Sequence, residues 1–363
     1  MIYQLIIITI AVLGVTIIML LCEFFLRFFK NKLRKENFDN IKRVPNVELK
    51  RSYEINSYGN ENQNSRKCDI LGWDMIKNSE ISVKIKVPYF EKNYYCKYII
   101  NNYGARSNSK KTNPDDKYFG IFGCSISYGF ALNEESTFAN LVQKEMLDYN
   151  YLNFSVPGYS LYQSLIKYKL KSKDIKFDFI ILGIHQDLER RNTCSISWAD
   201  IINNYWKIPR TYKIVRFFNF SPTNKSKIEI INILKFFIGN IRFIQILTMR
   251  SLLLEFQKEC IKNNTKLYII CFDKYNSIYS FLTKNKFNWN SAHLNLEQKN
   301  FKNEYIYQLM PWDNHPNMEA NLIFAKKILE LINHSKNNSD IFKPKISNSK
   351  DEQNTQEFIY TLW

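Results

Sequence analysis

The sequence has no cysteine pair in the CxxC spacing, and its seven cysteines are an odd number. Disulfide frameworks and structural zinc sites use paired or closely spaced cysteines, so neither is expected. A helix-turn-helix, zinc-finger or RNA-binding signature is also absent, and the lysines are scattered along the chain. We therefore expect no nucleic-acid partner, although basic residues exceed acidic ones by 51 − 34 = 17.

The first 22 residues carry no charge, and residues 5–22 are almost continuous isoleucine, leucine and valine. At about 1.5 Å per helical residue, this stretch is long enough to cross most of a bilayer. A cleaved signal peptide would need a basic start and a small-residue cleavage site, which the sequence lacks. We predict an uncleaved, single-pass transmembrane anchor over residues 1–29.

The rest of the chain divides by composition into three parts. Residues 30–115 are predicted to be a juxtamembrane segment and a small β-rich lead-in, in which residues 81–87 alternate between apolar and polar side chains. Residues 116–334 alternate strand-like and helix-like segments, except for an aromatic and basic insertion over residues 192–242. Residues 335–363 are polar and are expected to be disordered.

Alternating strands and helices predict an α/β fold, with a parallel sheet covered by helices on both faces. The predicted strands are 118–123, 151–156, 177–184, 266–272 and a short one near 305–309. The predicted helices are 135–148, 161–173, 243–263, 275–284 and 318–332.

Ser125 lies on the turn between the first of these strands and the helix that follows it. Gly123 allows a tight turn there, and the spacing from Gly123 to Gly129 does not fit a phosphate-binding P-loop. Ligands of open α/β sheets bind at the carboxyl ends of the strands, where this serine is expected. An ordinary strand–helix turn is the alternative interpretation.

A serine nucleophile needs a base and a group that orients the base. Among the four histidines, His315 follows Asp313 on the loop before the last helix, which lies at the same edge of a doubly wound sheet. Gly158 and Gln186 follow the second and third strands and are candidate oxyanion donors. Cys124 is the rival nucleophile.

In four blocks the chain resembles the SGNH/GDSL hydrolase superfamily, in the form of its membrane-anchored bacterial members. Residues 123–129 (GCSISYG) resemble the first block, Gly-Asp-Ser-x-Ser/Thr-x-Gly, and residues 153–160 (NFSVPGYS) resemble the second. Residues 182–188 (LGIHQDL) are similar to the third block, Gly-x-Asn-Asp, and residues 313–317 (DNHPN) to the last. Residues 101–106 (NNYGAR) are similar to the segment that precedes the first block in many bacterial members.

The resemblance implies a flavodoxin-like sheet of the SGNH-hydrolase fold and an acyl-transfer site. Ser125 would be the nucleophile, His315 the base and Asp313 its orienting partner, with Gly158 and Gln186 in the oxyanion hole. The sequence departs from the family in Cys124, which replaces an aspartate, and in Gln186, which stands where asparagine is expected. The spacing of Asp313 and His315 is one residue shorter than the commoner one.

We predict a membrane-anchored serine esterase that acts on O-acyl groups of a carbohydrate or lipid and needs no metal or cofactor. The alternatives are an O-acetyltransferase for a cell-surface polysaccharide and a non-catalytic membrane scaffold with a degenerate SGNH domain. His185 is the rival base, on the loop after the third strand.

The side of the membrane on which the domain lies is predicted from two opposed observations. Arg27, Lys30 and Lys32 follow the apolar stretch over residues 5–22 and no basic residue precedes it, which favours a cytoplasmic domain. The resemblance favours an extracytoplasmic domain, because anchored members of the family are associated with envelope polysaccharides. Because lysine is abundant throughout the chain, the basic residues after the apolar stretch are a weak signal of orientation. We therefore expect the domain on the extracytoplasmic side.

Overall fold

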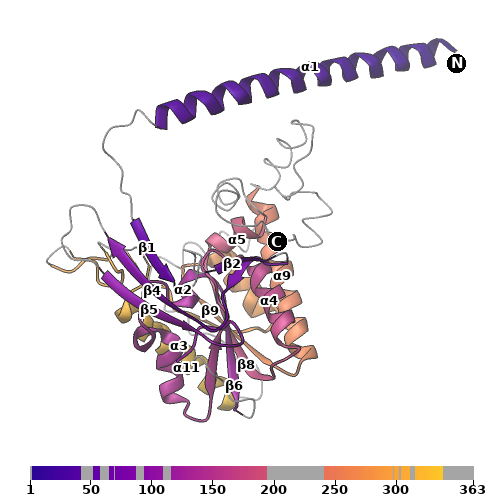
Figure 1. The fold of residues 1–363 in the computed structure, drawn as a ribbon. Helices are drawn as coiled ribbons and strands as arrows, with labels where there is room; N and C mark the ends of the chain where they lie inside the picture. Colours follow the sequence, from indigo (N-terminus) through magenta and orange to yellow (C-terminus); the bar gives the residue numbers. More distant parts are fainter. Residues whose placement is uncertain are drawn as a thin grey trace.

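The computed structural model describes residues 2–41, 52–57, 65–68, 70–86, 94–108, 116–193, 241–296, 298–301, 304–310 and 315–337. Its first element is the 40-residue helix α1 (Ile2–Ile41), which extends away from the rest of the chain (Figure 1). The window Ile8–Phe25 of this helix is long and apolar enough to cross a membrane, and none of it is buried. An N-terminal signal sequence would have the same length and apolar composition, so these two properties do not distinguish it from an anchor.

A five-stranded parallel sheet forms the centre of the chain. Its strands are β6 (Tyr118–Phe122), β7 (Asn150–Asn153), β8 (Phe177–Ile184), β9 (Lys266–Cys271) and β10 (Asn288–Ser291). Their spatial order is β10-β9-β8-β6-β7, and all neighbours run parallel. In chain order this is 2-1-3-4-5, which is the flavodoxin-like arrangement. The predicted α/β fold class is therefore confirmed.

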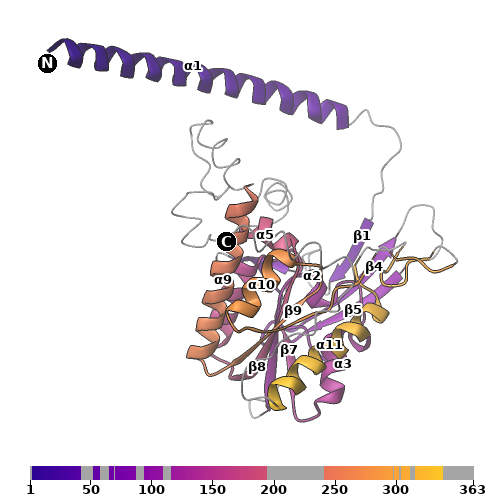
Figure 2. The same cartoon turned by 180° about the vertical axis from the view of Figure 1, so that it is seen from behind.

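Helices cover both faces of the sheet, as Figures 1 and 2 show. On one face, α4 (Leu161–Lys171), α9 (Arg242–Lys262) and α10 (Asn276–Lys284) share a hydrophobic core with the strands. On the other face, α3 (Phe138–Glu145) and α11 (Met318–Asn337) form a second core. Every residue of β6 is buried, as expected for a central parallel strand packed on both sides.

Two predicted elements differ from the structure. No strand forms over 305–309, where the described residues make only isolated bridges, and the fifth strand is β10. Its sequence, Asn-Trp-Asn-Ser, has no apolar run that would identify it as a strand. The helix predicted over 135–148 is divided into the 3₁₀ turn η1 (Glu134–Ser136) and α3, because Thr137 caps α3 by accepting a hydrogen bond from Asn140 N–H.

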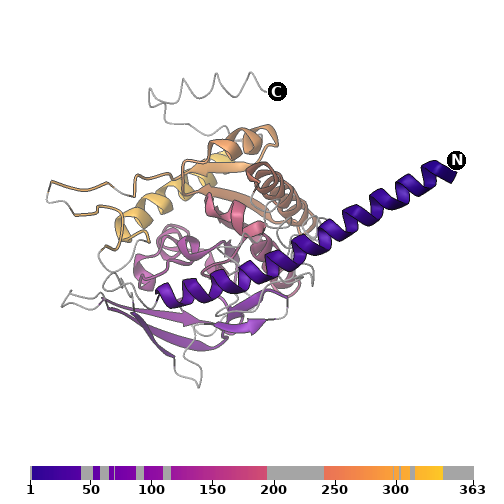
Figure 3. The same ribbon diagram turned by 90° about the horizontal axis from the view of Figure 1, so that it is seen from above.

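The lead-in is made of antiparallel strands that lie beside the parallel sheet (Figure 3). Strands β1 (Ser52–Ser57), β4 (Ser79–Lys86) and β5 (Tyr94–Ile100) form one sheet in the order β1-β4-β5. Strands β2 (Ser65–Cys68) and β3 (Gly72–Met75) form a separate hairpin. The core of the lead-in contains Tyr128 and Leu132 from the segment after β6, and Val156 and Tyr159 from the segment after β7. The lead-in thus supports two loops at the carboxyl edge of the parallel sheet.

The predicted insertion and tail lie almost wholly outside the described residues. Of the insertion, the structure describes residues 192–193, at the end of α5 (Asp187–Asn192), and residues 241–242, at the start of α9. Of the tail, it describes residues 335–337, the last residues of α11.

Candidate active site

Ser125 is the first residue of the short helix α2 (Ser125–Tyr128), directly after β6, and it is half-buried. Gly123 has a φ of 153°, which residues with a side chain rarely adopt. A Cβ atom at Gly123 or Gly183 would overlap the buried Ser127 side chain, which lies between these two glycines. This packing lets α2 lie directly against the ends of β6 and β8, and it presents Ser125 at the carboxyl edge of the sheet.

Arg106 holds the segment that follows Ser125. Its fully buried guanidinium donates hydrogen bonds to the backbone carbonyls of Tyr128, Gly129 and Leu132, at 2.9, 2.8 and 2.7 Å. Its Nε pairs with Glu134 Oε2 at 2.6 Å. The carbonyls at the end of α2 are therefore satisfied by a side chain from the lead-in rather than by water.

His315 lies close to the segment that begins at Ser125. Its half-buried ring lies 4.9 Å from the ring of Phe130, measured between centroids. Its backbone carbonyl accepts a hydrogen bond from Leu309 N–H at 3.1 Å. Phe130 belongs to the segment that begins at Ser125, so the fold places the His315 ring beside this segment. Asp313, its predicted partner, lies outside the described residues.

Gly158 lies on the turn after β7, with a φ of 82° that favours glycine. The indole of Trp73 supports this turn, since its Nε1 donates to the carbonyl of Pro157 at 3.2 Å. In return, the hydroxyl of Tyr159 donates to the carbonyl of Trp73 at 2.7 Å. The backbone around Gly158 is thus fixed from both sides by the lead-in.

Gln186 is exposed and immediately precedes α5. Its backbone N–H donates to Asp273 Oδ2 at 2.9 Å, across the ends of β8 and β9. Gln186 therefore lies on the predicted edge of the sheet, where its side chain extends into solvent.

The side chains of Cys124, His185 and Asp273 lie close together, and the motifs did not predict this. Cys124 Sγ lies 2.9 Å from His185 Nε2, and His185 Nδ1 lies 3.9 Å from Asp273 Oδ2. Cys124 is fully buried and His185 is 7% exposed. In the sequence, Cys124 is the rival nucleophile and His185 the rival base. Asp273 belongs to no motif and follows β9 without a distinctive pattern.

The contact changes the acidity of both groups. Burial alone would raise the pKa of the Cys124 thiol, but the charge and hydrogen bond of His185 outweigh it and lower this pKa to about 6. Burial would likewise lower the pKa of His185, but the adjacent Cys124 thiolate outweighs it and raises that pKa. Both shifts favour the charged forms of the two groups, a thiolate and an imidazolium.

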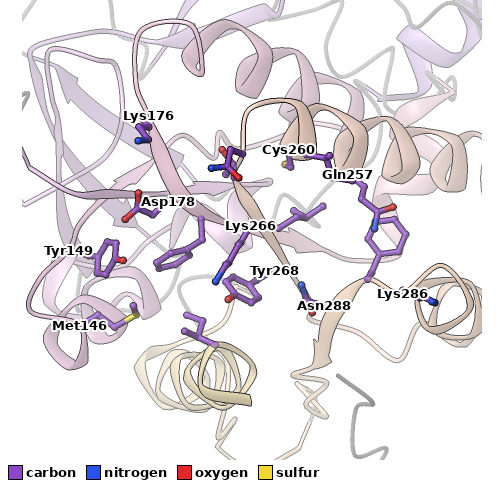
Figure 4. Close-up of a pocket in the computed structure, with 17 residues that line it drawn as sticks. Met146, Tyr149, Lys176, Asp178, Gln257, Cys260, Lys266, Tyr268, Lys286 and Asn288 are labelled. Atoms are coloured by element: carbon purple, nitrogen blue, oxygen red, sulfur yellow. The ribbon is translucent and has the colours of Figure 1, made fainter. Parts of the chain in front are cut away.

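A separate cavity of about 620 Å³ lies at the opposite, amino edge of the sheet (Figure 4). Lys176 before β8, Lys266 at the start of β9 and Asn288 at the start of β10 contribute to its lining. None of the predicted site residues lines it. Within the described part of the chain, no group of three or more histidine, cysteine, aspartate or glutamate residues could hold a metal ion.

No protein-family model matches the sequence. No curated protein matches it either.

Several solved structures are similar to the chain. A psychrotrophic esterase, EstA from Pseudoalteromonas sp., is 13% identical, with a TM-score of 0.38 over 61% of this chain and 100% of that one. A GDSL-like lipase from Bacteroides thetaiotaomicron is 10% identical, with a TM-score of 0.36 over 62% of this chain and 91% of that one. The acetylxylan esterase Axe2 from Geobacillus stearothermophilus is 12% identical, with a TM-score of 0.35 over 61% of this chain and 96% of that one.

Proposed function

We propose that the chain is a membrane-anchored serine esterase that hydrolyses O-acyl esters of a carbohydrate or lipid. The observation that carries this proposal is the position of Ser125 on the turn after the central strand β6, with the His315 ring 4.9 Å from Phe130. A nucleophile and a candidate base from opposite ends of the α/β part thus lie on neighbouring loops. Acyl transfer through a serine needs a base within reach of the hydroxyl, and the neighbouring loops support this pairing.

In the proposed reaction, His315 removes the proton from Ser125 Oγ while the oxygen attacks the ester carbonyl carbon. Asp313 orients the imidazole and stabilises its positive charge. The backbone N–H groups of Ser125 and Gly158, with Gln186, donate to the oxyanion. His315 then gives its proton to the leaving alcohol, and water resolves the acyl-enzyme to release the acid. If an acceptor hydroxyl takes the place of water, the same intermediate gives acyl transfer.

Reaction of the full chain with a fluorophosphonate probe tests this proposal. We expect one covalent adduct on Ser125 and release of acetate from an activated acetyl ester. His315→Ala should lose both activities, whereas His293→Ala, which changes an exposed histidine after β10, should keep them. Absence of labelling in the wild-type chain would favour a non-catalytic scaffold. Transfer of the acetyl group to an added sugar, without free acetate, would favour a transferase.

We also propose that α1 anchors the domain and that the domain faces the outside of the membrane. The apolar window Ile8–Phe25 supports the anchor, and a surface-polymer substrate supports the outward side. A Ser349→Cys chain in intact cells should react with a membrane-impermeant maleimide beyond the level of the parent chain. Reaction only after cell lysis would contradict the outward orientation and the surface-polymer substrate with it.

A further inference from the structure

The side chains of Cys124, His185 and Asp273 come from the carboxyl ends of three neighbouring strands. Cys124 follows β6, His185 follows β8 and Asp273 follows β9, and these strands are adjacent in the order β9-β8-β6. The 2.9 Å contact between Cys124 Sγ and His185 Nε2 is of hydrogen-bond length. Asp273 Oδ2 lies 3.9 Å from the other ring nitrogen and accepts the N–H of Gln186. The three residues therefore link the ends of β6, β8 and β9, and Cys124 immediately precedes Ser125 in the chain.

Cys124 cannot act as the nucleophile in this structure. Its side chain is fully buried and belongs to the hydrophobic core beneath α4 and α9. Ser125, the next residue, is half-buried. Whatever the thiol contributes must act through its neighbours, among them the ring of His185 and the backbone of Ile126.

We propose that Cys124 and His185 form a buried thiolate–imidazolium pair, assisted by Asp273, that fixes the loop after β8 against the nucleophile turn. Resting on the proposed esterase function, the contact sets the position of Gln186, which follows His185, relative to Ser125, which follows Cys124. Cys124, His185 and Asp273 are positioning residues in this proposal. Ser125 and His315 carry out the chemistry.

The physical reason is that a hydrogen bond between two buried groups of opposite charge holds the two loops in one geometry. An imidazolium is attracted to a thiolate most strongly where water is excluded. Alone, it would lose its proton on burial, and the thiolate prevents this. Because Cys124 and His185 are donor and acceptor to one another, the pair also adds a polar contact between β6 and β8 inside an apolar core.

Other charged groups near the pair adjust its range of pH. Arg191 and Asp187 of α5 and Asp273 after β9 all interact electrostatically with His185, and Arg191 also acts on Cys124. Arg191 favours the thiolate and opposes the imidazolium, whereas Asp273 favours the imidazolium. The ion pair should therefore exist above the pKa of Cys124, which is about 6, and below the raised pKa of His185.

The ultraviolet absorbance of the thiolate, measured against pH in the full chain, tests the pair without any need for turnover. We expect one thiolate signal at neutral pH that is absent from Cys124→Ser and moves to higher pH in His185→Gln. Cys260→Ser is the matched control, because burial raises the pKa of this buried thiol to about 12 and its loss should not change the signal. A wild-type chain with no thiolate at neutral pH would refute the pair.

Steady-state kinetics test the role of the Cys124–His185 pair in the site. His185→Gln should lower kcat by roughly 10- to 100-fold with nearly constant KM, since the pair positions Gln186, whose hydrogen bond to the oxyanion acts on the transition state rather than on substrate binding. Cys124→Ser should lower kcat in the same way, and Asp273→Asn should move the alkaline limit of activity to lower pH. Melting temperatures of these variants within a few degrees of wild type would separate a loss of positioning from misfolding.

The outcomes distinguish this inference from the proposed function. Unchanged kcat in folded His185→Gln and Cys124→Ser, in a chain that fluorophosphonate labels at Ser125, would refute the positioning role and leave the esterase intact. A thiolate signal in a wild-type chain that shows neither labelling nor turnover would refute the proposed function, and the catalytic role of the pair with it.

Discussion

Replacing Ser125 with alanine is expected to abolish fluorophosphonate labelling and to lower the rate of ester hydrolysis by roughly 10⁴-fold or more. The physical reason is that the hydroxyl is the atom that bonds to the acyl group, and no backbone donor can replace it. Ser125 lies at the start of α2 on the turn after β6, where a substrate can approach it. Mass spectrometry of the labelled chain and steady-state rates with an activated acetyl ester measure both effects.

Two comparisons make this result specific. Ser172→Ala, at the end of α4 and far from the carboxyl edge, should label like wild type. Cys124→Ala should turn over more slowly through loss of its contact with His185, yet it should still carry the adduct on Ser125. An adduct on Cys124 in the wild-type chain, or hydrolysis that survives Ser125→Ala, would assign the nucleophile to the thiol.

The elements that the sequence predicted well are those with a strong local pattern. The strand predicted over 177–184 coincides with β8, because it is an almost continuous apolar run. α4 begins where predicted, since Ser160 and Gln163 form a capping box. β10 was missed because its four residues are mostly polar, and their place in the sheet depends on pairing with β9 rather than on local preference.

The candidate site was predictable where its residues lie in motifs, and not where contacts join distant strands. Ser125 and Gly158 were placed on turns by their glycines and flanking apolar runs, and both lie on turns in the structure. The contact of Cys124 with His185 depends on the adjacency of β6 and β8 and on the depth of both side chains. No spacing in the sequence encodes it, and Asp273 has no pattern at all.

Arg106→Met is expected to lower the free energy of unfolding by about 3–5 kcal/mol, because it breaks a buried ion pair and leaves its partner groups without a donor. The partners are Glu134, which also accepts a hydrogen bond from the Tyr151 hydroxyl, and three backbone carbonyls over residues 128–132. The rings of Tyr98 and Tyr128 also lose a guanidinium that lies 4.6 and 5.0 Å from their centroids. Denaturant unfolding of the full chain in detergent, followed by tryptophan fluorescence, measures the change.

Lys97→Ala is the matched control on β5, because Lys97 pairs with Glu80 at 2.7 Å while its side chain is 53% exposed. Exposed pairs contribute less than about 1 kcal/mol, so this variant should unfold near the wild-type midpoint. Arg106→Lys keeps the charge but cannot reach three carbonyls and a carboxylate from one nitrogen, so it should also be destabilised and should lower kcat by loosening the end of α2. If Arg106→Lys matches wild type in both midpoint and kcat, a single charge is sufficient there and the carbonyl contacts do not position Ser125.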